Sequence, residues 1–263
     1  MKDIGVEFFF ILSGFVISYK YAQKIADKTI SKKEFFVARI ARIYPLHCIT
    51  FLFVALLVLR DTLRHDISFP WTQMLFNISL LQSFVPSRSY YFSFNAVSWS
   101  ISDELFFYVM FPVLIYCLQK IRRIGRVLLC FAILVCYFVV ISIIPEEYVH
   151  PLFYISPYLR IIDFMIGIGL FHLWEKLYAD KTKNRFFLFL QKKGLASFVE
   201  ITALGFLILM VFVSDKVPQR FRYASYYWIP MALVILCFSK TAPSGGGGGN
   251  YPPPVMEPFG VCR

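Results

Sequence analysis

The stretch "VLLCFAILVCYFVVISII", from Val127 to Ile144, carries no charged residue and decides the class of protein. A helix needs about 20 mostly apolar residues to cross the hydrocarbon core of a bilayer. Over the whole chain, 58% of the residues are hydrophobic and the mean hydropathy is +0.63. One soluble core of this size cannot hide so much apolar surface. The sequence therefore predicts an all-α, multi-pass transmembrane helical bundle.

Other segments have a similar composition. We expect further spans in the opening segment around Glu7–Tyr19 and at Ile43–Leu59, Ser98–Leu118, Pro151–Trp174, Leu195–Val213 and Tyr223–Ser239. Together with Val127–Ile144 they make about seven spans. Met74–Val85 is apolar but short, so we expect a re-entrant or interfacial segment there, with an eighth span as the alternative.

The net charge of +11 alone could indicate a nucleic-acid-binding protein, but the positions of Lys and Arg argue against nucleic acid as a partner. Basic residues gather in alternate loops, at Tyr19–Arg42, Lys120–Arg126 and Glu175–Lys193. Because cytoplasmic loops carry an excess of Lys and Arg, these loops are predicted to be cytoplasmic and the N-terminal end external. Membrane lipids are therefore the expected surroundings.

The two ends of the chain are unusual for such a protein. Met1 falls almost at the start of a span, without a signal-peptide pattern before it, which suggests that a preceding span is missing. At the other end the composition changes abruptly to Gly and Pro. We expect one membrane domain over residues 1–239 and a tail over residues 240–263 that is disordered or aberrant, a flexible cytoplasmic tail being the alternative.

Any chemistry must come from polar residues in or beside the spans. Glu7 precedes Ser13 and Gly14 in the first span, where the small residues also suit simple helix packing. Arg39 and Arg42 are three residues apart, on one helical face at a predicted cytoplasmic end. Arginine forks suit phosphate, although the pair could equally signal topology or contact lipid headgroups.

Asp103 and Glu104 lie inside the apolar segment Ser98–Pro112. A helix that runs inward from Ser98 places Glu104 roughly 9 Å along its axis. A carboxylate at that depth is protonated or paired, which suits a general acid or base, whereas a structural hydrogen bond is the alternative. Glu7 is expected near the same external end, so the sequence predicts a cavity that Glu7 and Glu104 share.

Arg160 and Asp163 form the fourth polar group, three residues apart in mid-span. Such a pair either fixes the orientation of one helix or lines a polar substrate cavity. The cysteines and histidines show no metal-ligand spacing, so no metal site is predicted. Among the histidines, only His47, close to Arg42, attracts attention.

Four motifs together resemble the acyltransferase 3 family of integral membrane carbohydrate O-acyltransferases. They are "GVEFFFILSGFVISY" (Gly5–Tyr19), "ARIARIYPLH" (Ala38–His47), "SWSISDELFFYVMFP" (Ser98–Pro112) and "LRIIDFMIGIGL" (Leu159–Leu170). The first and third are quite specific together, and the similarity covers about Asp3 to Ser239. The family usually has a preceding span with a catalytic histidine and further spans downstream, so the resemblance implies a chain truncated at both ends whose own activity is in doubt.

The resemblance also implies roles for individual residues. It makes Glu104 and Glu7 catalytic and assigns Arg39 and Arg42 to the acyl donor. The remaining matches imply a substrate cavity lined by Ser98, Trp99, Ser100, Tyr108, Arg160 and Asp163.

What the resemblance implies about function is transfer of an acetyl group to a hydroxyl of a cell-surface glycan, such as a lipopolysaccharide or exopolysaccharide, in the bacterial inner (plasma) membrane. Acetyl-CoA is the implied co-substrate, a glycan or glycolipid is the acceptor, and no permanently bound cofactor is expected. The alternatives are a transporter or flippase of a glycan or lipid precursor, with Glu104, Arg160 and Asp163 along its pathway, and a non-catalytic membrane protein.

Overall fold

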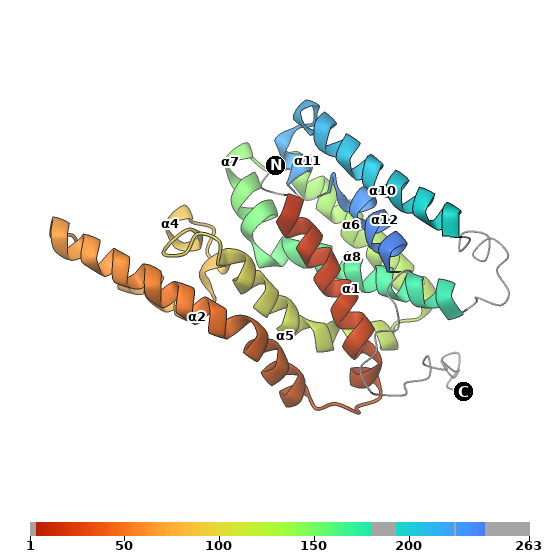
Figure 1. Ribbon diagram of the computed structural model, residues 1–263, viewed down its shortest axis with the longest axis horizontal. Helices are drawn as coiled ribbons and strands as arrows, with labels where there is room; N and C mark the ends of the chain where they lie inside the picture. The colour runs from red at the N-terminus through yellow and green to blue at the C-terminus, as the bar shows by residue number, and fades with distance from the viewer. Residues whose placement is uncertain (1–3, 180–192, 224, 240–263) are drawn as a thin grey trace.

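The computed structural model describes residues 4–179, 193–223 and 225–239, which form a bundle of helices with no strand among them (Figure 1). The longer helices are α1 (Ile4–Ala26), α2 (Lys32–His65), α5 (Trp99–Lys120), α6 (Arg123–Ile143), α8 (Pro157–Ala179), α10 (Lys193–Val213) and α12 (Trp228–Phe238). Short elements connect them: α3 (Trp71–Ile78), η1 (Gln82–Phe84), α4 (Arg88–Tyr91), α7 (Glu146–Val149), the π-helix η2 (His150–Ile155), η3 (Ser214–Lys216) and α11 (Gln219–Arg222). The predicted tail over residues 240–263 lies outside the described residues.

The predicted multi-pass helical bundle is confirmed. Within the described ranges, 5 helices are long and apolar enough to cross a membrane, and a bent pair of helices makes up to 6. The predicted span Tyr223–Ser239 contains only α12, an apolar helix of 11 residues. A turn that ends at Tyr227 separates α12 from α11. Hydropathy does not reveal this turn, because tyrosines are also common at the ends of membrane-spanning helices.

Two other predicted segments also depart from straight spans. Pro151–Trp174 is not one helix, because the chain bends by 48° between the segment ending at Ile155 and α8. Pro157 begins α8, as expected for a residue that has no backbone N–H to donate. Met74–Val85 contains the end of α3, of 8 residues, and η1, with a left-handed backbone at Leu80 between them. Neither piece is long enough to span a bilayer, in line with the prediction.

Helix α2 begins earlier than the predicted span Ile43–Leu59. Ser31 caps its first turn, where the Ser31 side chain accepts from the Glu34 N–H and the Glu34 carboxylate accepts from the Ser31 N–H. Such a capping box satisfies two backbone donors that would otherwise lack partners. Pro45 therefore lies inside a helix of 34 residues. Figure 1 shows the C-terminal half of α2 projecting beyond the rest of the bundle.

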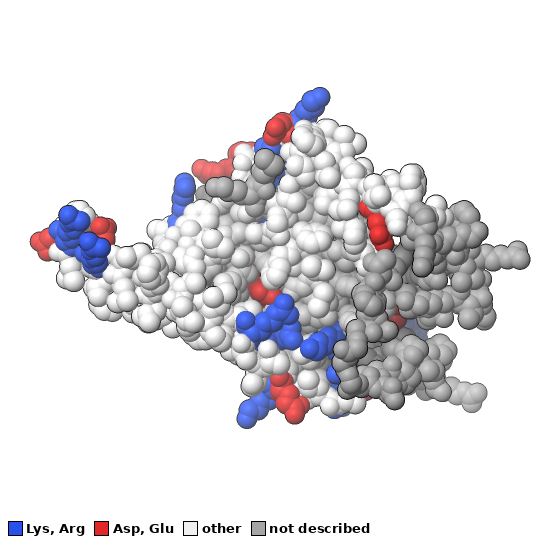
Figure 2. Space-filling view, viewed as in Figure 1, with Lys and Arg blue, Asp and Glu red and all other residues white. Residues whose placement is uncertain are grey.

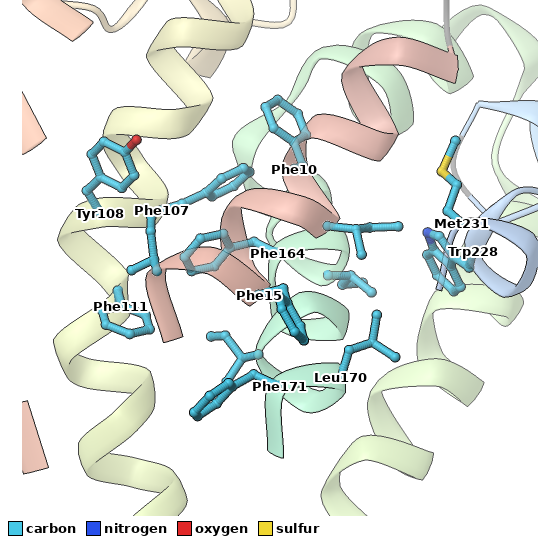
Figure 3. Close-up of a cluster of buried hydrophobic side chains, with 14 of the residues drawn as sticks. Phe10, Phe15, Phe107, Tyr108, Phe111, Phe164, Leu170, Phe171, Trp228 and Met231 are labelled. Carbon is cyan, nitrogen blue, oxygen red and sulfur yellow. The ribbon is translucent and has the colours of Figure 1, made fainter. Parts of the chain in front are cut away.

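Helix α1 lies in the middle of the bundle and packs against α5 and α8. Phe10 of α1 meets Phe107 of α5 edge to face, with ring centroids 4.9 Å apart, and Phe107 stacks on Phe164 of α8 at 5.2 Å. Figure 3 shows these rings converging from the three helices. Aromatic pairs in these geometries add to the stabilisation that burial alone provides.

Gly14 of α1 and Gly167 of α8 meet where these two helices cross. A Cβ atom at Gly167 would lie 2.8 Å from the backbone nitrogen of Phe15 and 2.9 Å from the Cα of Gly14. No side chain fits at either position, so the two backbones touch. Close approach through small residues is a common way for membrane helices to associate. Of the alternatives weighed for Gly14, helix packing is therefore the one that the structure shows.

Candidate active site

Glu104 is the centre of a polar cluster where α1, α2 and α5 meet. Its side chain is buried, with 5% of the residue exposed. The hydroxyl of Tyr108, one turn further along α5, donates to the Glu104 carboxylate, and Ser13 Oγ of α1 lies 3.5 Å from its Oε1 atom. Ser13 can reach Glu104 because the neighbouring Gly14 faces α8, and successive residues on a helix point about 100° apart.

Two arginines of α2 complete this cluster. Arg39 is buried and donates from Nη2 to the hydroxyl of Tyr21 over 2.9 Å. Its guanidinium carbon lies 4.8 Å from the ring centroid of Tyr21 and 5.8 Å from that of Tyr108. Arg42, one turn further along, is exposed, and the charges of both arginines act on Glu104. Figure 2 shows basic and acidic side chains side by side near the middle of this face, among mostly uncharged residues, in the region where Figure 1 draws α2 and α5.

This arrangement brings together a shielded carboxylate, hydroxyl donors and an exposed guanidinium. A carboxylate in such surroundings can exchange a proton with a bound hydroxyl group, and a nearby guanidinium can hold a phosphate. The structure thus unites four residues that the sequence had assigned to different roles, namely Glu104, Tyr108, Arg39 and Arg42. Tyr21 was missed, because a tyrosine on the inner face of a helix gives no specific signal.

A second polar cluster lies between α1, α5, α8 and α12. Arg160 and Asp163 form the predicted ion pair at 2.7 Å, with side chains 0% and 1% exposed. Arg160 Nε donates to the carbonyl oxygen of Tyr154, and Trp228 Nε1 donates to Asp163 over 2.6 Å. These bonds hold Arg160 through Nε and Nη1 and Asp163 through both carboxylate oxygens, at a site closed to solvent. The geometry therefore favours a structural role over an open substrate cavity.

Glu7 belongs to this second cluster, because it is buried and its charge acts on Arg160. Asp103 is fully buried and is also within electrostatic reach of Arg160, whereas the adjacent Glu104 faces Tyr108 and Arg39. Helix α5 therefore separates two carboxylates that are neighbours in the sequence. The predicted cavity shared by Glu7 and Glu104 is not what the structure shows, since the two residues lie in different clusters.

The Ser-Trp-Ser block lies at the start of α5. Ser98 Oγ donates to the carbonyl oxygen of Asn95 over 2.7 Å, and Ser100 Oγ donates to that of Val97 over 3.0 Å. Trp99 is buried against Tyr154, with ring centroids 5.0 Å apart. All three residues shape the helix start and its packing, and within the described part of the chain none of their hydrogen bonds or ring contacts reaches Glu104.

His47 continues the inner stripe of α2 beyond Arg39. Its ring is buried, and Nε2 lies 3.0 Å from the carbonyl oxygen of Asn77, in the last turn of α3. Because a carbonyl oxygen only accepts, this contact places the imidazole proton on Nε2. His47 thus links α3 to α2.

Comparison with known proteins agrees with this arrangement of motifs. The profile of the family described as "Acyltransferase domain" matches residues 1–246. "Acyltransferase MdmB" of Streptomyces mycarofaciens is 33% identical over 124 residues, which cover 46% of this chain and 30% of that protein. "Putative peptidoglycan O-acetyltransferase YrhL" of Bacillus subtilis is 25% identical over 256 residues, covering 92% of this chain and 39% of the relative.

A further relative, "Putative O-acetyltransferase SACOL0978" of Staphylococcus aureus, is 25% identical over 98% of this chain and 43% of its own length. The chain thus spans less than half the length of these relatives. No solved structure matches the chain. Since the profile covers nearly the whole sequence and the multi-pass bundle carries the expected motifs, the chain belongs to the acyltransferase 3 family of membrane proteins.

Proposed function

We propose that this protein is a membrane O-acyltransferase that moves an acetyl group from acetyl-CoA to a hydroxyl of a cell-surface glycan. The observation that carries the proposal is the cluster of Glu104, Tyr108 and Ser13 beside the exposed Arg42. Relatives named as O-acetyltransferases support acetyl as the group, and the word peptidoglycan in one name supports a glycan acceptor. The proposed location is the plasma membrane, where such an acceptor is assembled or exported.

In the proposed reaction, the acceptor hydroxyl oxygen bonds to the carbonyl carbon of the acetyl thioester. The carbon–sulfur bond then breaks, and CoA leaves as its thiolate, which takes up a proton. Glu104 is the group placed to receive the hydroxyl proton, with Tyr108 and Ser13 orienting its carboxylate. Arg42 binds phosphate of the donor at the predicted cytoplasmic end, which leaves the thioester to extend toward Glu104.

The test is transfer of radiolabelled acetyl from acetyl-CoA by the protein in membrane vesicles that contain envelope glycan. We expect label in the glycan as an alkali-labile ester. Glu104→Gln should reduce this transfer by about 100-fold or more, the usual contribution of a general base. Glu147→Gln, which changes an exposed carboxylate before η2, is the matched control and should leave transfer unchanged.

Two results would refute the proposal. One is movement of glycan precursor across the vesicle membrane without any covalent label, which is the behaviour of a transporter. The other is full transfer by a normally expressed Glu104→Gln protein.

A further inference from the structure

Arg39 is held by two tyrosines from two different helices. Tyr21 of α1 accepts its hydrogen bond and presents the closer ring, while Tyr108 of α5 presents the second ring. A guanidinium over an aromatic face is stabilised further when it is shielded from water. Arg39 is 6% exposed, so this cation is almost fully shielded from water.

Tyr108 connects Arg39 to the proposed base, because its ring faces Arg39 while its hydroxyl donates to Glu104. A continuous chain of contacts therefore runs from Tyr21 through Arg39 and Tyr108 to Glu104. Its members come from α1, α2 and α5, and it ends at the Glu104 carboxylate. Arg42 has the opposite character, since it is exposed and no hydrogen bond to it is present among the described residues.

We propose that Arg39 and Arg42 have different roles, and that Tyr21 is a positioning residue. Tyr21 holds Arg39, which supports Tyr108 and hence the direction of the Glu104 carboxylate, while Arg42 binds the donor phosphate. This inference rests on the proposed acyl transfer. It assigns a structural role to Arg39 and phosphate binding to Arg42, in place of phosphate binding by both arginines.

The test separates kcat from KM for acetyl-CoA in vesicles that contain envelope glycan. Tyr21→Phe keeps the ring and removes the acceptor of a hydrogen bond from a charged donor, so kcat should fall about tenfold with little change in KM. Arg42→Gln should raise KM about tenfold or more with kcat nearly retained. Tyr19→Phe is the matched control on α1, because Tyr19 is 64% exposed, and it should change neither constant.

A purely structural role for Tyr21 would lower the yield of folded protein and leave the constants per folded molecule unchanged, which overturns the inference. A second test is the pair Tyr21→Phe and Arg39→Lys. If both act through one chain of contacts, the double variant should be no slower than Arg39→Lys alone. Independent, multiplying losses would contradict the inference, as would a raised KM with normal kcat for Tyr21→Phe.

Failure of the proposed function is recognised separately. Absence of label transfer by the wild-type protein overturns the acyl transfer and the role of Tyr21 with it. Normal transfer by the wild-type protein together with an unaltered Tyr21→Phe variant overturns only the inference.

Discussion

Replacing Gly14 with alanine is expected to push α1 and α8 apart. A Cβ atom at this position would overlap the carbonyl oxygen of Phe164 and lie 3.2 Å from the Cα of Gly167. These obstacles are backbone atoms, which cannot turn away as a flexible side chain would. The two helices must therefore separate, and the packing between them must loosen over the whole contact.

The size of the effect follows from two opposing terms. Overpacking costs about 1–3 kcal/mol, and the upper end applies where backbone meets backbone. Alanine returns about 1 kcal/mol through its higher helix propensity than glycine. We therefore expect Gly14→Ala to lower the free energy of unfolding by about 2 kcal/mol. Ser13 should also move away from Glu104, so that the proposed acetyl transfer falls with stability.

Two glycines serve as matched controls, because a Cβ at Gly5 of α1 or Gly169 of α8 meets no atom within 4 Å. Gly5→Ala and Gly169→Ala should be neutral or stabilising by up to about 1 kcal/mol. The measurement is reversible unfolding in mixed micelles at increasing SDS, followed by tryptophan fluorescence. A Gly14→Ala protein as stable as the two controls would refute the reasoning from backbone contact.

Three further predictions concern single side chains. Tyr108→Phe removes the donor to Glu104 and should reduce acetyl transfer about tenfold at unchanged expression, measured by label incorporation. Asp163→Ala leaves the Arg160 charge buried without its ion-pair partner and should lower the free energy of unfolding by about 3–5 kcal/mol. Trp228→Phe removes one hydrogen bond to Asp163 and should lower it by about 1–3 kcal/mol in the same unfolding assay. Equal losses for these two would contradict the ion-pair argument. Ser31→Ala removes the cap of α2 and should cost about 1 kcal/mol, and an unchanged unfolding curve would show that the cap adds no stability.

Much of the fold was predictable because hydrophobic length is a local property. The uncharged stretch Val127–Ile144 corresponds closely to α6, and the short stretch Met74–Val85 indeed forms no long helix. The errors occurred where backbone geometry overrides composition. Hydropathy does not reveal the bend before Pro157, the turn before Trp228, or the capping box that starts α2 well before Pro45.

The sequence predicted which polar residues belong to the candidate site, but it did not predict which of them lie together. Its depth in an apolar segment singled out Glu104, and helical spacing singled out Arg39 with Arg42 and Arg160 with Asp163. Tyr108 was indicated only by the family resemblance. Glu7 was grouped with Glu104 because both were expected near the external end, but position along a helix axis does not specify the direction in which a side chain points.

The sequence by itself determined that this chain lies in a membrane, that it is helical, and which polar residues are embedded in its apolar segments. These properties depend on the free energy of transferring residues from water to lipid, which is nearly additive along the chain. Only the tertiary structure decided that Asp103 and Glu104 face different clusters, that Tyr21 holds Arg39, and that Gly14 lets α1 touch α8. Such contacts depend on how helices rotate and cross, and this is set by packing between segments distant in sequence.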